Sequence, residues 1–297
     1  MLILRCLNLK ITYECTNKCS FCFSMHMKNK NIPLEELKKA VVKGHKNECD
    51  ELVLSGGEPT LYPNYIMELI DLGKTLGYKK YIIQTNGYGL SQYEDLIAFI
   101  GNVAKEDDLC ISFSVHSHIE SVHDDISGNK GAFKNLVNAI NKITKTNCKI
   151  YTNTVVNARN IDDLKDISAY LKHYNVSIMQ FSIMHLKEEH ELSVSFTDAV
   201  KAIRELGCVV DNDILKTEGV PYCLLHGMEK CVGESAWPNC LDIYNETDNY
   251  LHDFKQLEYG MRKKMTSCDK CIMDKICVGV WKETYGEFSA MKIHPIM

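Results

Sequence analysis

The sequence predicts an α/β protein built on a partial, TIM-like (β/α)6 barrel, followed by a small cysteine-rich C-terminal extension. Two observations predict this fold. Short apolar runs of strand length alternate with longer segments of helical period six times between about residues 6 and 186. The alternation then stops, and a region rich in cysteine follows. Because six units are fewer than the eight of a closed barrel, we expect an open barrel in residues 1–186 and an extension in residues 187–297.

The individual elements are predicted from local pattern and from helix and strand ends. The first helix has Pro33 in its first turn, and Gly77 ends the second helix. The predicted strands are residues 1–9, 51–55, 81–85, 109–115, 149–156 and 177–184. The predicted helices are residues 33–46, 64–76, 92–100, 132–143 and 162–173, with a further helix at 197–206. Strands that alternate with helices at this spacing indicate parallel βαβ units.

Side chains alternate in polarity along the predicted fourth strand. Cys110, Ser112, Ser114 and His116 share one face, and the apolar residues between them share the other. The third strand places Gln84 beside Asn86, and the sixth places Gln180 beside Ser182. Since the apolar face packs against helices, the polar face predicts an occupied cavity inside the barrel. The alternative is that these polar groups only hydrogen-bond one another.

Composition excludes several classes of protein. Of 297 residues, 45% are hydrophobic and 25% are charged, which is typical of globular proteins. The net charge of −5 argues against sequence-independent nucleic-acid binding, which needs a basic surface. We expect no membrane span, because no apolar run is long enough, and no signal peptide. We therefore expect a cytoplasmic protein.

Fourteen cysteines stand out in this composition. Without an export signal, clustered cysteines indicate metal binding rather than disulfides. Three lie near the start of the chain and six lie between Cys223 and Cys277. The remaining five are scattered, and we expect them to be small buried hydrophobic residues. These are Cys6, Cys49, Cys110, Cys148 and Cys208.

The first group has the spacing Cys15-x3-Cys19-x2-Cys22. Three thiolates leave a four-iron cluster one ligand short, so one iron would stay open to a ligand that is not protein. A structural zinc site is the alternative, and it would need a fourth ligand. A second motif, Gly56-Gly57-Glu58-Pro59, follows a short apolar run and predicts a turn where the backbone comes close to a neighbour.

These two motifs, in this order, resemble the signature of the radical S-adenosylmethionine (SAM) enzymes. In that superfamily the open iron of a 4Fe-4S cluster binds SAM, and one electron from the cluster produces a 5′-deoxyadenosyl radical. The resemblance implies that the Gly-Gly-Glu-Pro turn contacts the methionine amino group of SAM. It also implies SAM contacts from Phe21 near the adenine and from Asn86, Ser114 and Asn153 near the ribose or carboxylate.

One part of the family pattern is missing. His123-Asp124 is similar to a pair found after the fourth strand in many relatives, which also carry an arginine near the position of Ser127. This chain has no arginine between Arg5 and Arg159. The partner of the SAM carboxylate is therefore open, and Lys130 is a candidate.

The cysteines at the C-terminal end form a second group. The spacing Cys268-x2-Cys271-x5-Cys277 resembles the core of the SPASM and twitch extensions of radical SAM enzymes. Trp281 stands where a further cysteine is expected, so the resemblance implies one auxiliary 4Fe-4S cluster instead of two. Its fourth ligand is expected to be Cys223, with Cys240 and then Cys231 as alternatives. A zinc site made by the same residues is the competing interpretation.

The resemblance implies an enzyme that cleaves SAM and abstracts hydrogen from its substrate. The first hypothesis is a ribosomal peptide, which would be cross-linked, epimerised or oxidised. The second is a small metabolite, and a non-enzymatic metal-binding protein is the remote alternative. The chain begins almost at its first strand, so we expect a leader-binding domain, if needed, to be a separate partner. An electron donor such as flavodoxin or ferredoxin is also expected.

Overall fold

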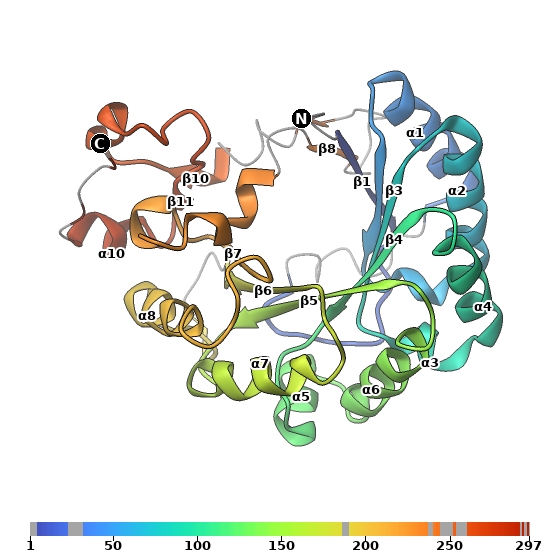
Figure 1. Ribbon diagram of the computed structural model, residues 1–297, viewed down its shortest axis with the longest axis horizontal. Coiled ribbons are helices and arrows are strands. Elements are labelled where there is room, and N and C mark those ends of the chain that lie inside the picture. Colours follow the sequence, from blue (N-terminus) through green and yellow to red (C-terminus); the bar gives the residue numbers. More distant parts are fainter. Residues whose placement is uncertain are drawn as a thin grey trace.

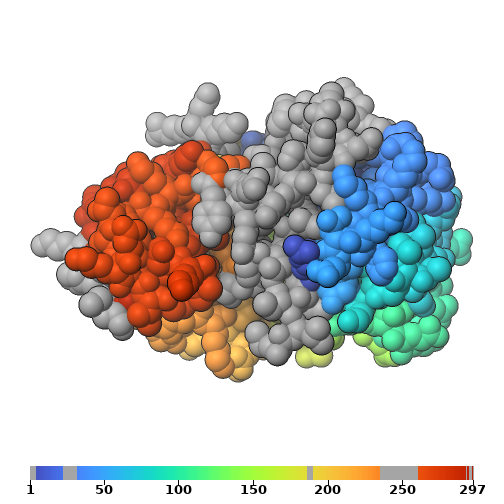
Figure 2. Space-filling model, turned by 90° about the horizontal axis from the view of Figure 1, so that it is seen from above, coloured from blue at the N-terminus to red at the C-terminus, as the bar shows by residue number. Residues whose placement is uncertain are grey.

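The computed structural model describes residues 5–22, 32–185, 190–236, 240–243, 252–253, 260–291, 293 and 296. In this part of the chain, a curved sheet and its helices occupy one side of the molecule and a cysteine-rich region occupies the other (Figure 1). Seen from above, residues 260–291 lie at one end and residues 32–100 lie toward the other (Figure 2).

Seven parallel strands, β1 to β7, lie side by side in the order of the chain. A further strand, β8, pairs parallel with β1 at the opposite edge, and β9 pairs antiparallel with β8. The strands are β1 (Cys6–Thr12), β2 (Glu51–Gly56), β3 (Lys80–Thr85), β4 (Asp108–Ser114), β5 (Lys149–Val156), β6 (Ile178–Ile183), β7 (Leu215–Glu218), β8 (Cys240–Ile243) and β9 (His252–Asp253). The predicted partial, TIM-like barrel is thus confirmed.

Helices follow the convex side of this sheet (Figure 1). They are α1 (Leu34–Lys46), α2 (Pro63–Leu76), α3 (Tyr88–Gln92), α4 (Glu94–Val103), α5 (Glu120–Ser127), α6 (Ala132–Ile143), α7 (Leu164–Lys172) and α8 (Phe196–Leu206). The apolar face of β4 packs on this side, and Ile111, Phe113 and Val115 are fully buried in the core. The polar residues of the same strand therefore face the concave side, as the alternation predicts.

Most predicted elements match the structure within a few residues, and α6 and β5 match at both ends. Gly77 ends α2 in the left-handed conformation, with φ of 93°. The first strand is displaced: it runs over Cys6–Thr12 instead of residues 1–9, and residues 1–4 lie outside the described residues. The short helices α3 and α5 were not predicted, since neither shows a long apolar period.

The expectation that strand–helix alternation stops near residue 186 is wrong. Helix α8 leads into β7, which pairs parallel with β6, so a further unit extends the sheet. Strand β7 has only four residues, and its sequence Leu-Lys-Thr-Glu buries only Leu215 and Thr217, which makes its pattern weak. The boundary between two domains near residue 186 stays a prediction.

The cysteine-rich region contains little regular structure. A two-stranded ribbon joins β10 (Arg262–Lys263) to β11 (Val280–Trp281), and a 3-10 turn, η7 (Thr266–Lys270), lies between them in sequence. Helix α10 (Tyr285–Ala290) follows and buries Phe288 against Phe196 of α8. Among the described helices, none is both long and apolar enough to cross a membrane.

Candidate functional site

The loop that follows β1 carries Cys15, Cys19 and Cys22, and all three side chains are partly exposed. The backbone N–H of Cys22 donates to the carbonyl of Cys19 at 3.0 Å, which forms a turn between the two. In the described residues, no three His, Cys, Asp or Glu side chains converge closely enough to hold one metal ion. A four-iron cluster does not require such convergence, because each iron takes its own thiolate. The donor set therefore fits a cluster with one open iron.

The end of α5 holds this cysteine loop. The backbone N–H of Lys18 donates to the carbonyl of Ser127 at 2.8 Å, and Asn129 Nδ2 donates to Asn17 Oδ1 at 3.0 Å. Gly128 ends α5 with a φ of 58°, and a Cβ at this position would lie 2.7 Å from the carbonyl oxygen of Lys18. Ser127, near which relatives carry an arginine, therefore supports the loop through its backbone.

The Gly56-Gly57 turn at the end of β2 presses against the end of β1. A Cβ on Gly56 would clash with the carbonyl oxygen of Thr12, and one on Gly57 would clash with the carbonyl oxygen of Glu14. The backbone N–H groups of Gly57 and Glu58 donate to those two carbonyls, each at 2.7 Å. The turn thus lies against the residue that precedes Cys15, and the close backbone approach explains why glycine is needed.

The side chain of Glu58 is completely buried, and it is hydrogen-bonded to other residues of this chain. It accepts hydrogen bonds from Thr85 Oγ1 at 2.6 Å, from Asn86 N at 2.7 Å and from both the backbone N–H and the hydroxyl of Thr60. Burial raises the pKa of Glu58, and these donated hydrogen bonds oppose the shift. Pro59 is also buried and begins the 3-10 turn η2 (Pro59–Leu61). Because this side chain is already hydrogen-bonded inside the protein, Glu58 could contact SAM only through its backbone.

The other candidate SAM contacts lie at the carboxyl ends of neighbouring strands. Asn86 follows β3, and its Nδ2 donates to Thr16 Oγ1 at 3.1 Å and to Cys15 Sγ at 3.7 Å. Ser114 on β4 and Asn153 on β5 are register partners and both are partly exposed. The structure thus brings Asn86 to the cysteine loop and places Ser114 and Asn153 together on the concave face.

A hydrogen-bonded polar group continues along this face across β5, β6 and β7. Ser182 Oγ lies 2.7 Å from Asn153 Oδ1 and 2.8 Å from Glu218 Oε2. Gln180 Nε2 also donates to Glu218 Oε2 at 3.1 Å. Gln180 and Ser182 hydrogen-bond one another at 3.2 Å, as the alternative interpretation predicts, and an occupied cavity beside them stays a prediction. Glu218 was missed because β7 was not predicted.

Two stacked histidines lie beside the cysteine loop. The ring of His116 meets Phe21 edge-on at 5.2 Å and stacks on His123 at 5.7 Å. The backbone N–H of His116 donates to His123 Nδ1 at 3.3 Å, while His116 Nδ1 is buried with no hydrogen-bond partner among the described residues. Burial lowers the pKa of His116 to about 3 and that of His123 to about 4. Both rings are therefore neutral at pH 7.

The residues after His123 have structural roles in this chain. The Asp124 carboxylate accepts hydrogen bonds from the backbone N–H groups of Gly131 and Phe133, at 2.6 and 2.8 Å, and so caps the start of α6. Lys130, the candidate partner of the SAM carboxylate, is exposed.

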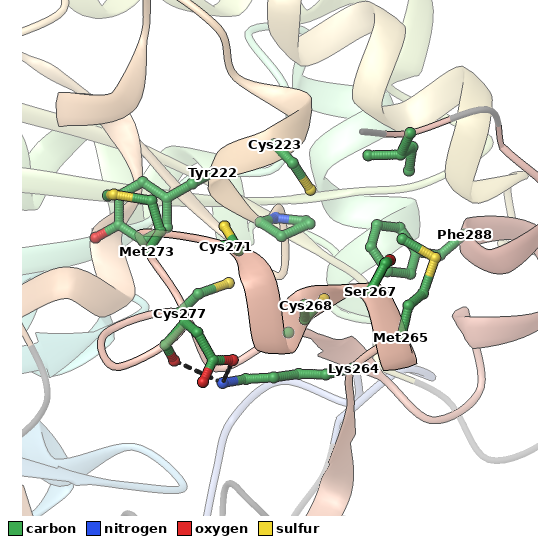
Figure 3. Close-up of a pocket in the computed structure, with 14 residues that line it drawn as sticks. Tyr222, Cys223, Lys264, Met265, Ser267, Cys268, Cys271, Met273, Cys277 and Phe288 are labelled. Atoms are coloured by element: carbon green, nitrogen blue, oxygen red, sulfur yellow. Dashed lines mark hydrogen bonds and ion pairs between the residues drawn. The ribbon is translucent and has the colours of Figure 1, made fainter. Parts of the chain in front are cut away.

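A pocket lies in the cysteine-rich region. Four cysteines line it, and Figure 3 shows their sulfur atoms directed toward one shared space. Cys223 comes from the 3-10 turn η4 (Tyr222–Leu224) directly after β7. Cys268, Cys271 and Cys277 come from η7 and the turn that follows it. At the rim, Lys264 Nζ lies 2.8 Å from Asp274 Oδ1.

Burial, reinforced by the neighbouring cysteines, raises the pKa of the Cys223 thiol to about 12. Burial also raises the pKa of Cys277. A bound metal reverses this effect, because it stabilises the thiolate directly. Four cysteines in one pocket thus form a donor set that fits a four-iron cluster.

Neither of the two alternative fourth ligands of the auxiliary cluster is found in this pocket among the described side chains. Cys231 is fully buried, and its Sγ is 3.5 Å from Asn212 Oδ1, so its side chain is held by the barrel side of the molecule. The backbone of Cys240 belongs to β8, beside Cys6 of β1, and its side chain lies outside the described residues. Of the scattered cysteines four are buried as predicted, but Cys208 is exposed, because it lies in the surface turn after α8.

Comparison with known proteins agrees with this geometry. The profile described as the Radical SAM superfamily matches residues 9–171. The Bacillus subtilis sporulation killing factor maturation protein SkfB is 25% identical over 162 residues, which are 54% of this chain and 37% of SkfB. A Methanocaldococcus jannaschii relative is 25% identical over 170 residues, which are 56% of this chain and 63% of that protein. The matches thus span less than two thirds of these relatives.

Two solved structures share the fold over nearly the whole chain. Streptococcus suis SuiB, crystallised with S-adenosylmethionine, has a TM-score of 0.68 at 15% identity, covering 99% of this chain and 76% of SuiB. The anSMEcpe structure with bound AdoMet has a TM-score of 0.66 at 17% identity, covering 94% of this chain and 89% of that one. At these identities the likeness shows the fold alone.

Proposed function

The chain belongs to the Radical SAM superfamily and is a radical SAM enzyme, and we propose that it abstracts a hydrogen atom from a ribosomal peptide. The observation that supports this most directly is the close approach of the Gly56-Gly57 turn to Thr12 and Glu14, in the segment that leads into Cys15. A reduced 4Fe-4S cluster would give one electron to bound SAM, which would break its sulfonium C–S bond into methionine and a 5′-deoxyadenosyl radical able to take a hydrogen atom from the substrate.

Cys15, Cys19 and Cys22 would each bind one iron, and the fourth iron would bind SAM. The Gly-Gly turn would lie beside that position, and backbone groups of the turn would orient the methionine part of SAM. Ser114 and Asn153, on the concave face, would contact its ribose or carboxylate, and Phe21 would pack near its adenine. The buried neutral ring of His116 would keep water away from the same region.

The polar group on β5, β6 and β7 supports a peptide as substrate. Asn153 and Gln180 present amide groups, and Ser182 and Glu218 present further hydrogen-bonding oxygens, on the concave face. Amide donors and acceptors match the groups of a peptide backbone. SuiB has been crystallised with the precursor peptide SuiA, and anSMEcpe with a peptide, which supports the same choice by likeness of fold. A small polar metabolite is the second candidate, because the same wall would bind it.

We further propose that Cys223, Cys268, Cys271 and Cys277 hold one auxiliary 4Fe-4S cluster, as in a SPASM or twitch extension. A single zinc ion would need three or more of these sulfurs within its own coordination shell, about 2.3 Å from the metal. The iron count of the reconstituted protein decides between the two. Such a cluster would pass electrons from a donor such as flavodoxin or ferredoxin.

The test is anaerobic reconstitution with iron and sulfide, followed by an iron count and a dithionite-driven assay of SAM cleavage. Wild type is compared with a Cys15/Cys19/Cys22→Ala variant. We expect about eight irons in wild type and about four in the variant, with 5′-deoxyadenosine lost only in the variant. If SAM were consumed and methyl groups moved while no 5′-deoxyadenosine formed, the proposed function would be wrong.

A second experiment separates the peptide from the metabolite. A deuterated peptide library and a deuterated pool of small metabolites are supplied in turn, and 5′-deoxyadenosine is analysed by mass spectrometry. Deuterium from the peptides in 5′-deoxyadenosine supports a peptide substrate. Deuterium only from the metabolites would replace that assignment with the second candidate.

A further inference from the structure

We propose that Asn86 is a positioning residue that hydrogen-bonds the sulfur of Cys15 and thereby raises the reduction potential of the iron–sulfur cluster, with Glu58 holding Asn86 in place. The inference rests on the proposed function, because it requires a cluster at Cys15. It gives Asn86 a role toward the cluster, in addition to any contact with SAM.

The orientation of the Asn86 amide follows from its partners. The backbone N–H of Tyr88 donates to Asn86 Oδ1 at 2.9 Å, which identifies this atom as the oxygen. The other end of the amide, Nδ2, must therefore face the cysteine loop, where it contacts Thr16 Oγ1 and Cys15 Sγ. An amide nitrogen has two N–H groups, so both contacts can form together. Cys15 Sγ also accepts from the backbone N–H of Asn17 at 3.4 Å.

Glu58 fixes the backbone of Asn86. Its Oε2 accepts the Asn86 N–H at 2.7 Å, and its Oε1 accepts from Thr60 N and Thr85 Oγ1. Both threonine hydroxyls also accept a hydrogen bond from a backbone N–H. Gly87 N donates to Thr85 Oγ1 and Gly89 N donates to Thr60 Oγ1, each at 2.9 Å, which is compatible with each hydroxyl donating its proton to Glu58.

In this arrangement Glu58 is an acceptor in every one of these contacts, which is the behaviour of a carboxylate. Its hydrogen bonds join the end of β2 to the end of β3, and Asn86 extends the chain of contacts to the first cysteine of the loop. The acidic residue of the Gly-Gly-Glu-Pro turn thus acts on the cysteine loop through Asn86.

A hydrogen bond to a cluster sulfur has a defined electrostatic effect. Reduction adds negative charge to the cluster and its thiolates, and an N–H group that points at a sulfur stabilises that charge. Hydrogen bonds to the sulfurs are one of the ways in which proteins set cluster potentials. Removing the Asn86 donor should therefore make the cluster harder to reduce and slow the first electron transfer.

The test compares Asn86→Ala and Asn86→Asp with wild type. Asn86→Asp keeps the size of the side chain and the acceptor for Tyr88 N, and it removes the donor to Cys15. Asn86→Ala removes both. Thr16→Val is the matched control, because it removes the other partner of Asn86 Nδ2 and leaves the contact with Cys15.

The readout is the midpoint potential of the cluster whose electron paramagnetic resonance signal changes when SAM is added. We expect a shift to more negative potential in both Asn86 variants, larger in Asn86→Asp because it adds a negative charge, and none in Thr16→Val. An unchanged potential in Asn86→Ala would overturn the inference. Loss of iron from both Asn86 variants would also overturn it, because Asn86 would then only support the loop. A wild type without any SAM-sensitive signal would instead contradict the proposed function.

Discussion

The guanidinium of Arg262 lies 3.5 Å from the centre of the Trp281 ring. Arg262 is also paired with Glu234 at 3.2 Å, and both side chains are buried. His185, after β6, stacks on Trp281 at 4.3 Å, and Glu234 Oε1 accepts the backbone N–H of Gly219 after β7. Trp281 stands where the SPASM resemblance leads one to expect a cysteine. An ion pair and stacked rings thus join the cysteine-rich region to the barrel at this point.

Replacing Arg262 by Met should strongly destabilise the protein. Removing Arg262 leaves Glu234 buried without its cationic partner, and breaking a buried pair typically costs about 3–5 kcal/mol, less where the carboxyl takes up a proton. We expect the free energy of unfolding, measured by urea denaturation, to fall by about this amount. The Arg262→Met/Glu234→Gln variant should recover part of the loss, because glutamine keeps an oxygen for Gly219 N. A double variant no more stable than Arg262→Met would contradict this account.

Gly57→Ala should damage the radical SAM site, whereas Gly77→Ala should not. At Gly57 a Cβ meets the backbone carbonyl of Glu14, so the cysteine loop would have to move. At Gly77 the φ of 93° is unfavourable for alanine but nothing lies within 4 Å, so only about 1–2 kcal/mol should be lost. We expect SAM cleavage to be abolished in the first variant and retained in the second. Equal cleavage by both variants would show that the close approach at Gly57 is not required.

The sequence predicts the barrel well because most of its elements have strong local signals. Strand β5 and helix α6 carry clear periods of 2 and 3.6 residues, and both were located at their true ends. Strand β7 has too few residues for such a signal, so neither the strand nor the role of Glu218 could be predicted. The cysteine groups were recognised by spacing alone. The contacts of Glu58 and Asn86 could not be predicted, because they join residues that are far apart in sequence.

Cys223→Ala should change the electron paramagnetic resonance signal of the auxiliary cluster if Cys223 is its fourth ligand, because one iron would lose its thiolate while three cysteines still hold the cluster. Cys231→Ala is the matched control, because Cys231 is buried beside Asn212, away from the pocket. We expect the control to keep the wild-type signal, and SAM cleavage driven by dithionite to persist in both variants. An unchanged auxiliary signal in Cys223→Ala would exclude Cys223, and a changed signal in Cys240→Ala would then identify Cys240 as the ligand.

Stability should fall as the pH is lowered from about 6.5 to about 4, because of His116 and His123. Their folded pKa values of about 3 and about 4 lie below the unfolded value of 6.5, so the unfolded state binds more protons in this range. Each histidine contributes a slope of about 1.4 kcal/mol per pH unit. Burial raises the pKa of Glu234 to about 7, so between pH 4.5 and 7 the folded state binds more protons at this residue than the unfolded state does. This one residue therefore increases the stability as the pH falls and offsets part of the effect of the two histidines.

His123→Asn isolates one of these contributions, since asparagine offers an oxygen to the backbone N–H of His116 without titrating. The free energy of unfolding is measured between pH 4 and 7 for both proteins. We expect the variant to have the weaker dependence on pH. If the two curves are parallel, His123 is not a neutral buried group in the folded protein.

The auxiliary pocket takes one cysteine from the end of β7 and three from a segment about 45 residues later in the chain. Iron bound to all four would cross-link those segments, much as a disulfide does. Closing a loop of that length restricts the unfolded chain by about 4 kcal/mol in the chain-entropy relation. Metal supply would then govern how long the cysteine-rich region survives proteolysis in the cell.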